Sequence, residues 1–320
     1  MRIAIASMML LIAVPLSAPC PAQQTQASQR PEVEQVSFET ADGVIIVADY
    51  YAAALPAGQK APVAILLHMY PSDRTSWRSF APKLVKKGIA ALAIDLRGHG
   101  LSVKPDDMKL AERRKKKDSR LYNAMDRDVA AAYQWLAGRG DVDLTRLAVV
   151  GASVGCSVAI DYARLDQSVD VVVCLSPGTN YLGVKSTDHI AKYGDRPILL
   201  MAGQVEQDDC ATLGKLTGKA TIKIYPMADR SRFEMHGTNL LAQVGEAEKV
   251  ALDFLLANIG KAASEPVVAS INSDVYHRPD SHYVRRIKPE NLRWFSSAAE
   301  AEARGLRSPR PPKSKSKSGQ

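Results

Sequence analysis

Between residues 33 and 262, apolar and polar positions alternate in two patterns that predict strands and helices in turn. Short runs rich in apolar and β-branched residues indicate strands, and longer stretches with one apolar face indicate helices, the longest of them at Tyr122–Ala137. Asp42-Gly43 separates the first two runs, which is typical of a β-hairpin. The runs predicted to be strands are Val33–Thr40, Val44–Tyr51, Pro62–Met69, Ile89–Leu96, Leu147–Gly151, Val171–Leu175, Pro197–Met201 and Ala220–Tyr225.

A hairpin followed by repeated strand–helix units predicts an α/β fold with a mostly parallel central sheet flanked by helices. Pro62–Met69 is apolar almost throughout, as expected of a strand that is buried on both faces. The connection between Leu175 and Pro197 has room for one helix, so we expect a minimal cap and an open site. The periodic pattern stops after Gly260, where a different segment begins.

The first residues of the chain have the pattern of an export signal. Arg2 precedes an uncharged, mostly apolar run of twelve residues, Ile3–Val14, which is too short to span a bilayer. We therefore expect a signal peptide over residues 1–22, cleaved after Ala22, and a periplasmic or secreted protein. Cys20 leaves a lipoprotein as the alternative. Residues 23–32 are expected to be a linker, and no later run is apolar enough for a transmembrane segment.

The formal net charge of +8 comes partly from two clusters of basic residues. Residues 309–320 form a basic tail without an acidic residue, and Arg113–Lys117 is a basic run that we expect in a loop. Such runs are usually solvated. They predict weak attraction to anionic surfaces and no specific binding of nucleic acid.

Three cysteines lie outside the predicted signal peptide, at Cys156, Cys174 and Cys210. Their odd number does not suggest a disulfide framework. Cys156 and Cys174 lie in apolar stretches, so we expect them to be buried free thiols.

A candidate nucleophile, Ser153, lies in Gly151-Ala152-Ser153-Val154-Gly155. A predicted strand precedes this motif and a predicted helix follows it, which is the setting in which two glycines allow a sharp turn that exposes a serine hydroxyl. A serine hydroxyl needs a base to become nucleophilic at neutral pH. His236, on a loop after the last predicted strand, is the histidine best placed to act as that base.

The acid that would orient this histidine is expected in the loop after Pro197–Met201. Glu206, Asp208 and Asp209 all lie there, and the sequence leaves the choice between them open. Glu206 lies at the distance from the end of the preceding strand at which this acid is commonly found. An oxyanion formed during acyl transfer needs N–H donors. One should come from Val154, and the other from the loop His68-Met69-Tyr70-Pro71.

These motifs, together with Asp95–Ser102 and His236-Gly237-Thr238, resemble the α/β-hydrolase superfamily. The order of the motifs is most similar to that of the small esterase, dienelactone-hydrolase-like and serine-aminopeptidase-like branches. The resemblance implies an α/β-hydrolase fold over residues 33–262 and catalysis without a cofactor or a metal. Met69 stands where this family usually has glycine. The roles that the family resemblance implies are Ser153 as nucleophile, His236 as base, Glu206 or Asp208 as acid, the backbone N–H groups of Tyr70 and Val154 as oxyanion hole, and structural roles for Asp95, Arg97 and His99.

Residues 263–308 resemble a small zinc module of the Ada type, through the segment around Tyr276-His277 and the Arg, Pro and Asn positions that follow it. In that module four cysteines hold the metal, whereas Ser281 or His282 occupies the first cysteine region here and the segment has no cysteine. We therefore expect a module that has lost its metal ligands.

The sequence as a whole predicts an exported serine hydrolase that cleaves a carboxylic ester of a small molecule through an acyl-enzyme on Ser153. Thioester or amide cleavage uses the same groups. The alternative is a non-catalytic scaffold that binds surfaces through its basic carboxyl-terminal segment.

Overall fold

The computed structural model describes residues 33–56, 58–260, 267–278, 281–288, 291–295 and 297–309. The chain divides into two compact units, Met1–Arg30 and Pro31–Gln320, and all described residues belong to the second. The predicted signal peptide, the predicted linker and the tail beyond residue 309 lie outside the described residues. Among the described helices, none is long and apolar enough to cross a membrane.

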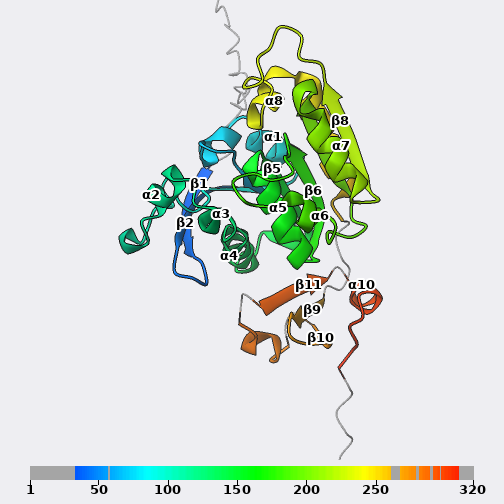
Figure 1. Ribbon diagram of the computed structural model, residues 1–320. Helices are drawn as coiled ribbons and strands as arrows, with labels where there is room; N and C mark the ends of the chain where they lie inside the picture. The colour runs from blue at the N-terminus through cyan, green and yellow to red at the C-terminus, as the bar shows by residue number, and fades with distance from the viewer. Residues whose placement is uncertain are drawn as a thin grey trace, which may run out of the picture. The chain divides into compact units, whose positions relative to one another are not determined.

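Eight strands form the central sheet, in the order β1-β2-β4-β3-β5-β6-β7-β8 (Figure 1). β2 pairs antiparallel with β1 and with β4, and all other neighbours are parallel. The predicted fold class is therefore confirmed. The strands are β1 (Val33–Glu39), β2 (Ile45–Tyr51), β3 (Ala61–Leu67), β4 (Ala90–Ile94), β5 (Val142–Ala152), β6 (Val169–Leu175), β7 (Ile198–Gly203) and β8 (Ala220–Tyr225).

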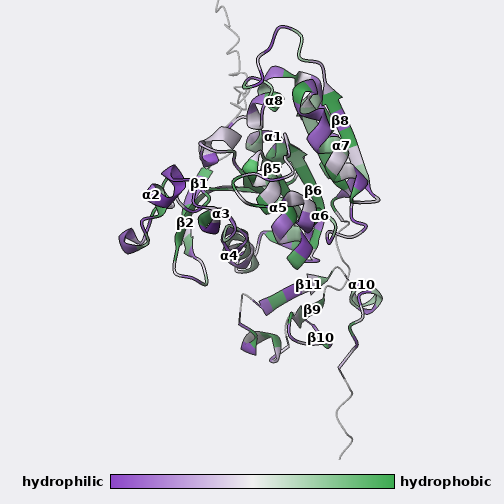
Figure 2. Cartoon of the chain, viewed as in Figure 1, coloured by the Kyte–Doolittle hydropathy of each residue, from purple (hydrophilic) through white to green (hydrophobic). Residues whose placement is uncertain are grey.

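Helices cover both faces of the sheet, because alternate residues of each buried strand point to opposite sides. In β3, Val63, Ile65 and Leu67 belong to one hydrophobic cluster, and Ala64 and Leu66 belong to the other. Figure 2 shows the central strands in hydrophobic colours between these layers. The helices are α1 (Ala81–Lys86), α2 (Leu110–Lys115), α3 (Ser119–Tyr122), α4 (Asp126–Ala137), α5 (Val154–Leu165), α6 (Ser186–Ile190), α7 (Gln207–Lys215), α8 (Thr238–Gln243) and α9 (Gly245–Asn258).

Two expectations about helices were wrong. The basic run Arg113–Lys117 was expected in a loop, but most of it lies in α2, whose residues are strong helix formers anchored by the buried Leu110. The predicted helix Tyr122–Ala137 is broken, since α3 ends at Tyr122 and α4 begins at Asp126. At the break, the Asn123 side chain donates to two backbone carbonyl groups, one of them 60 residues away.

Buried ion pairs hold the loops at the carboxyl end of β4. Arg74 donates to Asp49 and to Asp95, both at 2.7 Å, and Asp95 also accepts the Leu101 N–H. Arg97 pairs with Asp128 at 2.7 Å. These contacts agree with the structural roles expected for Asp95 and Arg97.

The carboxyl-terminal segment forms a three-stranded antiparallel sheet with β9 (Val267–Ser270) between β10 (Tyr276–His277) and β11 (Leu292–Phe295), followed by α10 (Ala298–Ala303). It has a small core of its own, which includes Val267, Tyr276 and Phe295. Trp294 packs against the larger core of the main sheet, and Arg304 donates to the Gln167 carbonyl group. In the described part of the chain, no group of three or more His, Cys, Asp or Glu side chains could hold a metal ion. The resemblance to a zinc module stays a prediction.

Candidate active site

Ser153 lies on the turn between β5 and α5, at the carboxyl edge of the sheet. Its backbone has φ 52° and ψ −118°, a conformation that residues other than glycine rarely adopt. A Cβ atom at Gly151 would overlap the backbone of Gly155, and one at Gly155 would overlap the carbonyl oxygen of Leu67. Both glycines are therefore needed for the close packing of α5 on β5 and β3, and the strained residue between them is the serine.

His236 and Glu206 meet at the same edge of the sheet, after β8 and β7 respectively. The Nδ1 atom of His236 lies 2.8 Å from Oε1 of Glu206. Glu206 ends a short 3-10 helix, Gln204–Glu206, and is only 3% exposed. A buried carboxylate on Nδ1 favours the tautomer in which Nε2 is free to accept a proton.

The Glu206 carboxylate is held in its charged form. Burial by itself raises the pKa of Glu206, but the hydrogen bond from His236, the electrostatic attraction to His236 and the positive charge of Arg232 outweigh it, so the pKa lies below its ordinary value. Arg232 contacts the same Oε1 atom at 3.2 Å, and its side chain is 68% exposed. One carboxylate oxygen of Glu206 therefore interacts with both a histidine and an arginine.

Asp208 and Asp209 do not contact His236. Both lie in the first turn of α7, where Asp208 is exposed and Asp209 accepts the backbone N–H of Thr179 at 3.2 Å. Of the three acidic residues that the sequence left open, the structure brings only Glu206 to the histidine.

Ser176 is a site residue that the sequence did not reveal. It directly follows β6, is fully buried and has φ 55°. Its Oγ atom accepts the Gly237 N–H at 3.0 Å and donates to the Met235 carbonyl oxygen at 3.4 Å. Ser176 therefore holds the backbone on both sides of His236. The preceding residue, Leu175, accepts the Ser153 N–H at 2.8 Å. The only signal in the sequence was a serine placed directly after a predicted strand.

The loop after β3 lies beside the turn that carries Ser153. The N–H groups of Tyr70 and Val154 make no hydrogen bond to the described part of the chain. His68 is fully buried, with Nδ1 donating to the Met69 carbonyl oxygen and Nε2 accepting the Leu96 N–H. The side chain of Met69 is buried against Gly237, so the methionine found in place of the usual glycine fills space under the histidine loop.

Tyr181 was also not anticipated. It comes from the connection between β6 and β7, in which α6 is the one α-helix, as expected from the shortness of that connection. Its ring lies 6.2 Å from that of His236 in an edge-to-face arrangement. The Tyr181 hydroxyl group is buried without a hydrogen-bond partner among the described residues. The site therefore has one aromatic wall beside the histidine.

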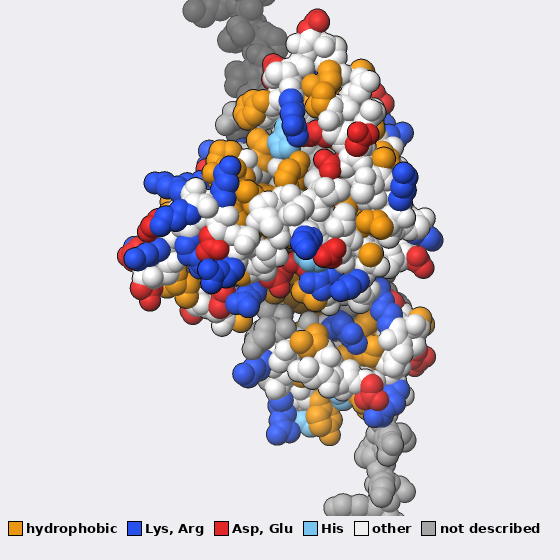
Figure 3. All heavy atoms as spheres, in the orientation of Figure 1, with side chains coloured by type: hydrophobic (Ala, Val, Ile, Leu, Met, Phe, Trp, Pro, Cys, Tyr) orange, Lys and Arg blue, Asp and Glu red, His pale blue; other side chains and the backbone are white. Residues whose placement is uncertain are grey.

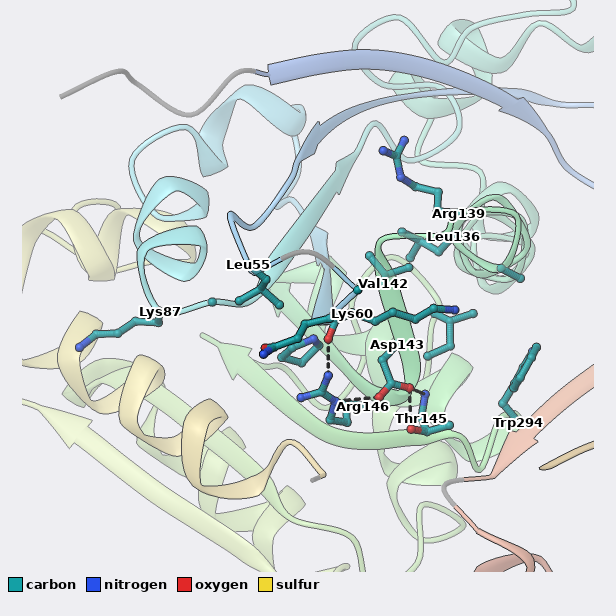
Figure 4. Close-up of a pocket in the computed structure, with 16 residues that line it drawn as sticks. Leu55, Lys60, Lys87, Leu136, Arg139, Val142, Asp143, Thr145, Arg146 and Trp294 are labelled. Carbon is teal, nitrogen blue, oxygen red and sulfur yellow. Dashed lines mark hydrogen bonds and ion pairs between the residues drawn. The ribbon is translucent and has the colours of Figure 1, made fainter. Parts of the chain in front are cut away.

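A cavity of about 640 Å³ lies elsewhere, at the amino-terminal ends of β3 and β5. Figure 4 shows that Lys60, Asp143, Arg146 and Trp294 contribute to its walls, and that Arg146 bonds to Asp143. Ser153 follows the opposite, carboxyl end of β5. This cavity is therefore separate from the candidate active site.

The geometry of a strained serine, a histidine and a buried carboxylate on a parallel sheet defines a class of hydrolytic enzymes. The family model described as "Alpha/beta hydrolase family" matches residues 64–303, and the chain belongs to this family. Two curated proteins of Mycobacterium tuberculosis, one from each of two strains and both described as uncharacterized, are 29% identical over 171 residues, which is 53% of this chain and 53% of each relative. The chain thus spans about half the length of these relatives.

Solved structures with the same fold include an esterase of Pyrococcus furiosus, with a TM-score of 0.55 and 19% identity over 72% of this chain and 94% of that one. A dienelactone hydrolase of Anabaena variabilis has a TM-score of 0.54 and 20% identity, over 72% of this chain and 100% of that one. A puromycin hydrolase has a TM-score of 0.57 and 18% identity, over 71% of this chain and 39% of that one. At these identities the similarity shows the fold and not the substrate.

Proposed function

We propose that the protein is an exported serine hydrolase that cleaves a carboxylic ester of a small molecule through an acyl-enzyme on Ser153. The observation that carries the proposal is the hydrogen bond between His236 and the buried Glu206, on the sheet edge where the strained Ser153 lies. Membership of a hydrolase family supports the same class of chemistry. Export rests on the pattern of residues 1–22 alone.

The mechanism follows from the roles that the geometry supports. Ser153 Oγ attacks the ester carbonyl carbon while His236 Nε2 accepts its proton, and Glu206 stabilises the charged imidazole ring. The negative charge that develops on the carbonyl oxygen is stabilised by the N–H groups of Tyr70 and Val154. The C–O bond to the alcohol breaks as His236 returns the proton to the leaving oxygen. Water, deprotonated by His236, then releases the acid and restores Ser153.

A fluorophosphonate probe tests the proposal directly, because it reacts with activated serine hydroxyl groups. The purified protein should be labelled on Ser153, and Ser153→Ala should abolish labelling while Ser119→Ala, an exposed serine on α3, retains it. Peptide mapping by mass spectrometry identifies the labelled residue. Absence of labelling in folded protein would overturn the proposal, and the hydrolase fold would then serve as a non-catalytic scaffold.

A further inference from the structure

The segment between β4 and α4 carries a dense group of basic residues. Residues 104–120, here called the basic arm, contain eight Lys and Arg and four Asp and Glu residues, a net charge of +4 and thus half of the formal net charge of the chain. They include a short 3-10 helix, Asp106–Met108, and α2. Figure 3 shows Lys and Arg side chains gathered on the part of the surface where Figure 1 places α2.

The basic arm borders the candidate active site. The Nζ atom of Lys117 lies 5.9 Å from the centre of the Tyr70 ring, on the loop that carries a proposed oxyanion donor. Directly after the arm, Asn123 donates to the Gly183 carbonyl oxygen at 3.1 Å. Gly183 belongs to the same β6–β7 connection as Tyr181, which contacts His236. The arm is therefore linked to two walls of the site.

Several positive charges of the arm have no acidic partner. Arg113 pairs with Asp118 at 2.8 Å, and Lys116 pairs with Glu112 at 2.6 Å. In contrast, Lys109, Lys115 and Lys117 are exposed and make no ion pair with any described residue. The carboxylate of the site itself, Glu206, is already paired with His236 and Arg232.

One cation of the arm, Arg114, acts electrostatically on the two histidines nearest Tyr70, His68 and His99. Burial is the largest cause that lowers the pKa of His99 to about 3, and the nearby His68 and the positive charge of Arg114 lower it further. His99 in turn packs against Tyr70, with ring centres 5.9 Å apart. A substrate carbonyl group bound beside Tyr70 would therefore lie near the positive charge of the basic arm.

We propose that the basic arm selects esters that carry a negative charge, so that the substrate of Ser153 is a small anionic ester whose anionic group lies near Lys115 and Lys117. This inference rests on the proposed function. A charge of this size beside an active site raises the local concentration of an anion and its rate of association by roughly 10- to 1,000-fold at low salt. The effect falls with ionic strength, because the screening length is only about 10 Å at 0.1 M salt.

Two esters of equal chain length measure this selectivity: p-nitrophenyl pentanoate, which is neutral, and mono-p-nitrophenyl glutarate, which ends in a carboxylate. After subtraction of spontaneous hydrolysis, kcat/KM is determined for both at low and at high salt. The ratio of kcat/KM for the anionic ester to that for the neutral ester should fall about three- to tenfold in Lys115→Gln/Lys117→Gln, and also in wild-type protein at high salt.

Two control variants separate charge from structure. Lys115→Arg/Lys117→Arg retains the cations and should retain the wild-type ratio. Lys219→Gln removes an exposed, unpaired lysine that precedes β8, at the amino-terminal end of the sheet, and should leave the ratio unchanged.

The possible outcomes distinguish the two proposals. If the fluorophosphonate probe labels Ser153 but the ratio is the same in wild-type protein and in Lys115→Gln/Lys117→Gln, the anionic-substrate proposal is wrong and the hydrolase proposal stands. If folded protein is neither labelled nor active on either ester, both proposals are wrong.

Discussion

Glu206 presents one carboxylate oxygen to both His236 and Arg232, at 2.8 and 3.2 Å. The arginine is exposed, so solvent screens its charge, whereas the hydrogen bond to the histidine is largely buried. The stronger of the two interactions is therefore the one with His236.

Replacement of the acid tests this assignment. Glu206→Gln removes the charge that stabilises the protonated imidazole ring, and kcat should fall by about 10²- to 10⁴-fold. Asp208→Asn, two residues further along the chain and exposed, should change kcat by less than about twofold. Steady-state hydrolysis of p-nitrophenyl esters measures both. An equal loss of kcat in the two variants would show that Glu206 is not the only acid that stabilises His236.

Ser176 gives a second prediction at the scale of a residue. Ser176→Ala leaves the buried Gly237 N–H without its acceptor, which costs about 1–3 kcal/mol of stability, and it loosens the loop that holds His236. We expect kcat to fall by about tenfold. KM should change little, because the buried Ser176 is not expected to contact the substrate. Ser186→Ala is the matched control, since Ser186 is a buried serine on α6 whose Oγ bonds to Ser157. Stability should fall in the control while kcat is retained; a kcat loss shared by both variants would contradict a positioning role.

At the scale of elements, Asp170 joins β6 to two neighbours. Its Oδ2 atom accepts the N–H groups of Leu147, on β5, and Gly260, after α9, at 3.0 and 3.3 Å. Burial raises the pKa of Asp170 to about 7 despite these hydrogen bonds. A carboxyl group whose pKa is raised on folding favours the folded state only while it is protonated.

The pH dependence of stability follows from this sign. Below the unfolded-state pKa, about 4, the carboxyl group is protonated in both states and does not lower the free energy of unfolding. As pH rises from there to about 7, the unfolded chain loses the proton first, so the free energy of unfolding falls by up to about 1.4 kcal/mol per pH unit. Asp170→Asn lacks this loss, so its Tm relative to wild type should increase from pH 5 to pH 7 and then level off. Thermal unfolding at pH 5, 6, 7 and 8 tests this, and parallel curves for the two proteins would refute it.

β11 contacts the main sheet through Trp294, which is partly buried against the larger hydrophobic core. Trp294→Ala should therefore lower the free energy of unfolding by about 1–3 kcal/mol, less than for a fully buried tryptophan. Phe233→Ala, a residue that is 69% exposed, is the control and should have little effect. Chemical denaturation measures both. Labelling of Ser153 should persist in Trp294→Ala, because β11 packs near the start of β5 and the serine follows its end.

The prediction of elements from sequence succeeded where the pattern is local. All eight strands of the main sheet were predicted within a few residues, because buried strands need continuous or alternating apolar residues wherever they lie in the chain. The break between α3 and α4 was missed, since Asn123 bonds to Gly183, a partner that no local pattern specifies. The helical state of Arg113–Lys115 was missed because a run of like charges usually indicates a solvated loop.

At the scale of the whole molecule, the proposal of export rests on the sequence alone. Protein recovered from the producing cell's periplasm or medium should begin at Gln23, if cleavage follows Ala22. Amino-terminal sequencing and intact mass measure this. A lipid adduct on Cys20, lost in Cys20→Ala, would show instead that the protein is a lipoprotein.

The basic charge of the whole chain also has a different significance once it is placed in space. In the sequence, +8 suggested only weak attraction to anionic surfaces. In the structure, the basic arm, which carries half of that charge, contacts Tyr70 through Lys117. The same residues can therefore influence which substrates reach Ser153.

The sequence by itself determined the α/β class, the order of the strands along the chain and the position of Ser153, because these depend on residue alternation and on two glycines within a few positions. Only the tertiary structure decided which carboxylate contacts His236, since Glu206, Asp208 and Asp209 lie within four residues and differ only in the direction that the chain gives them. It also placed Ser176 and the basic arm beside the site. Those contacts join residues that are far apart in the chain, and the packing of the parallel sheet is what brings their loops to one edge.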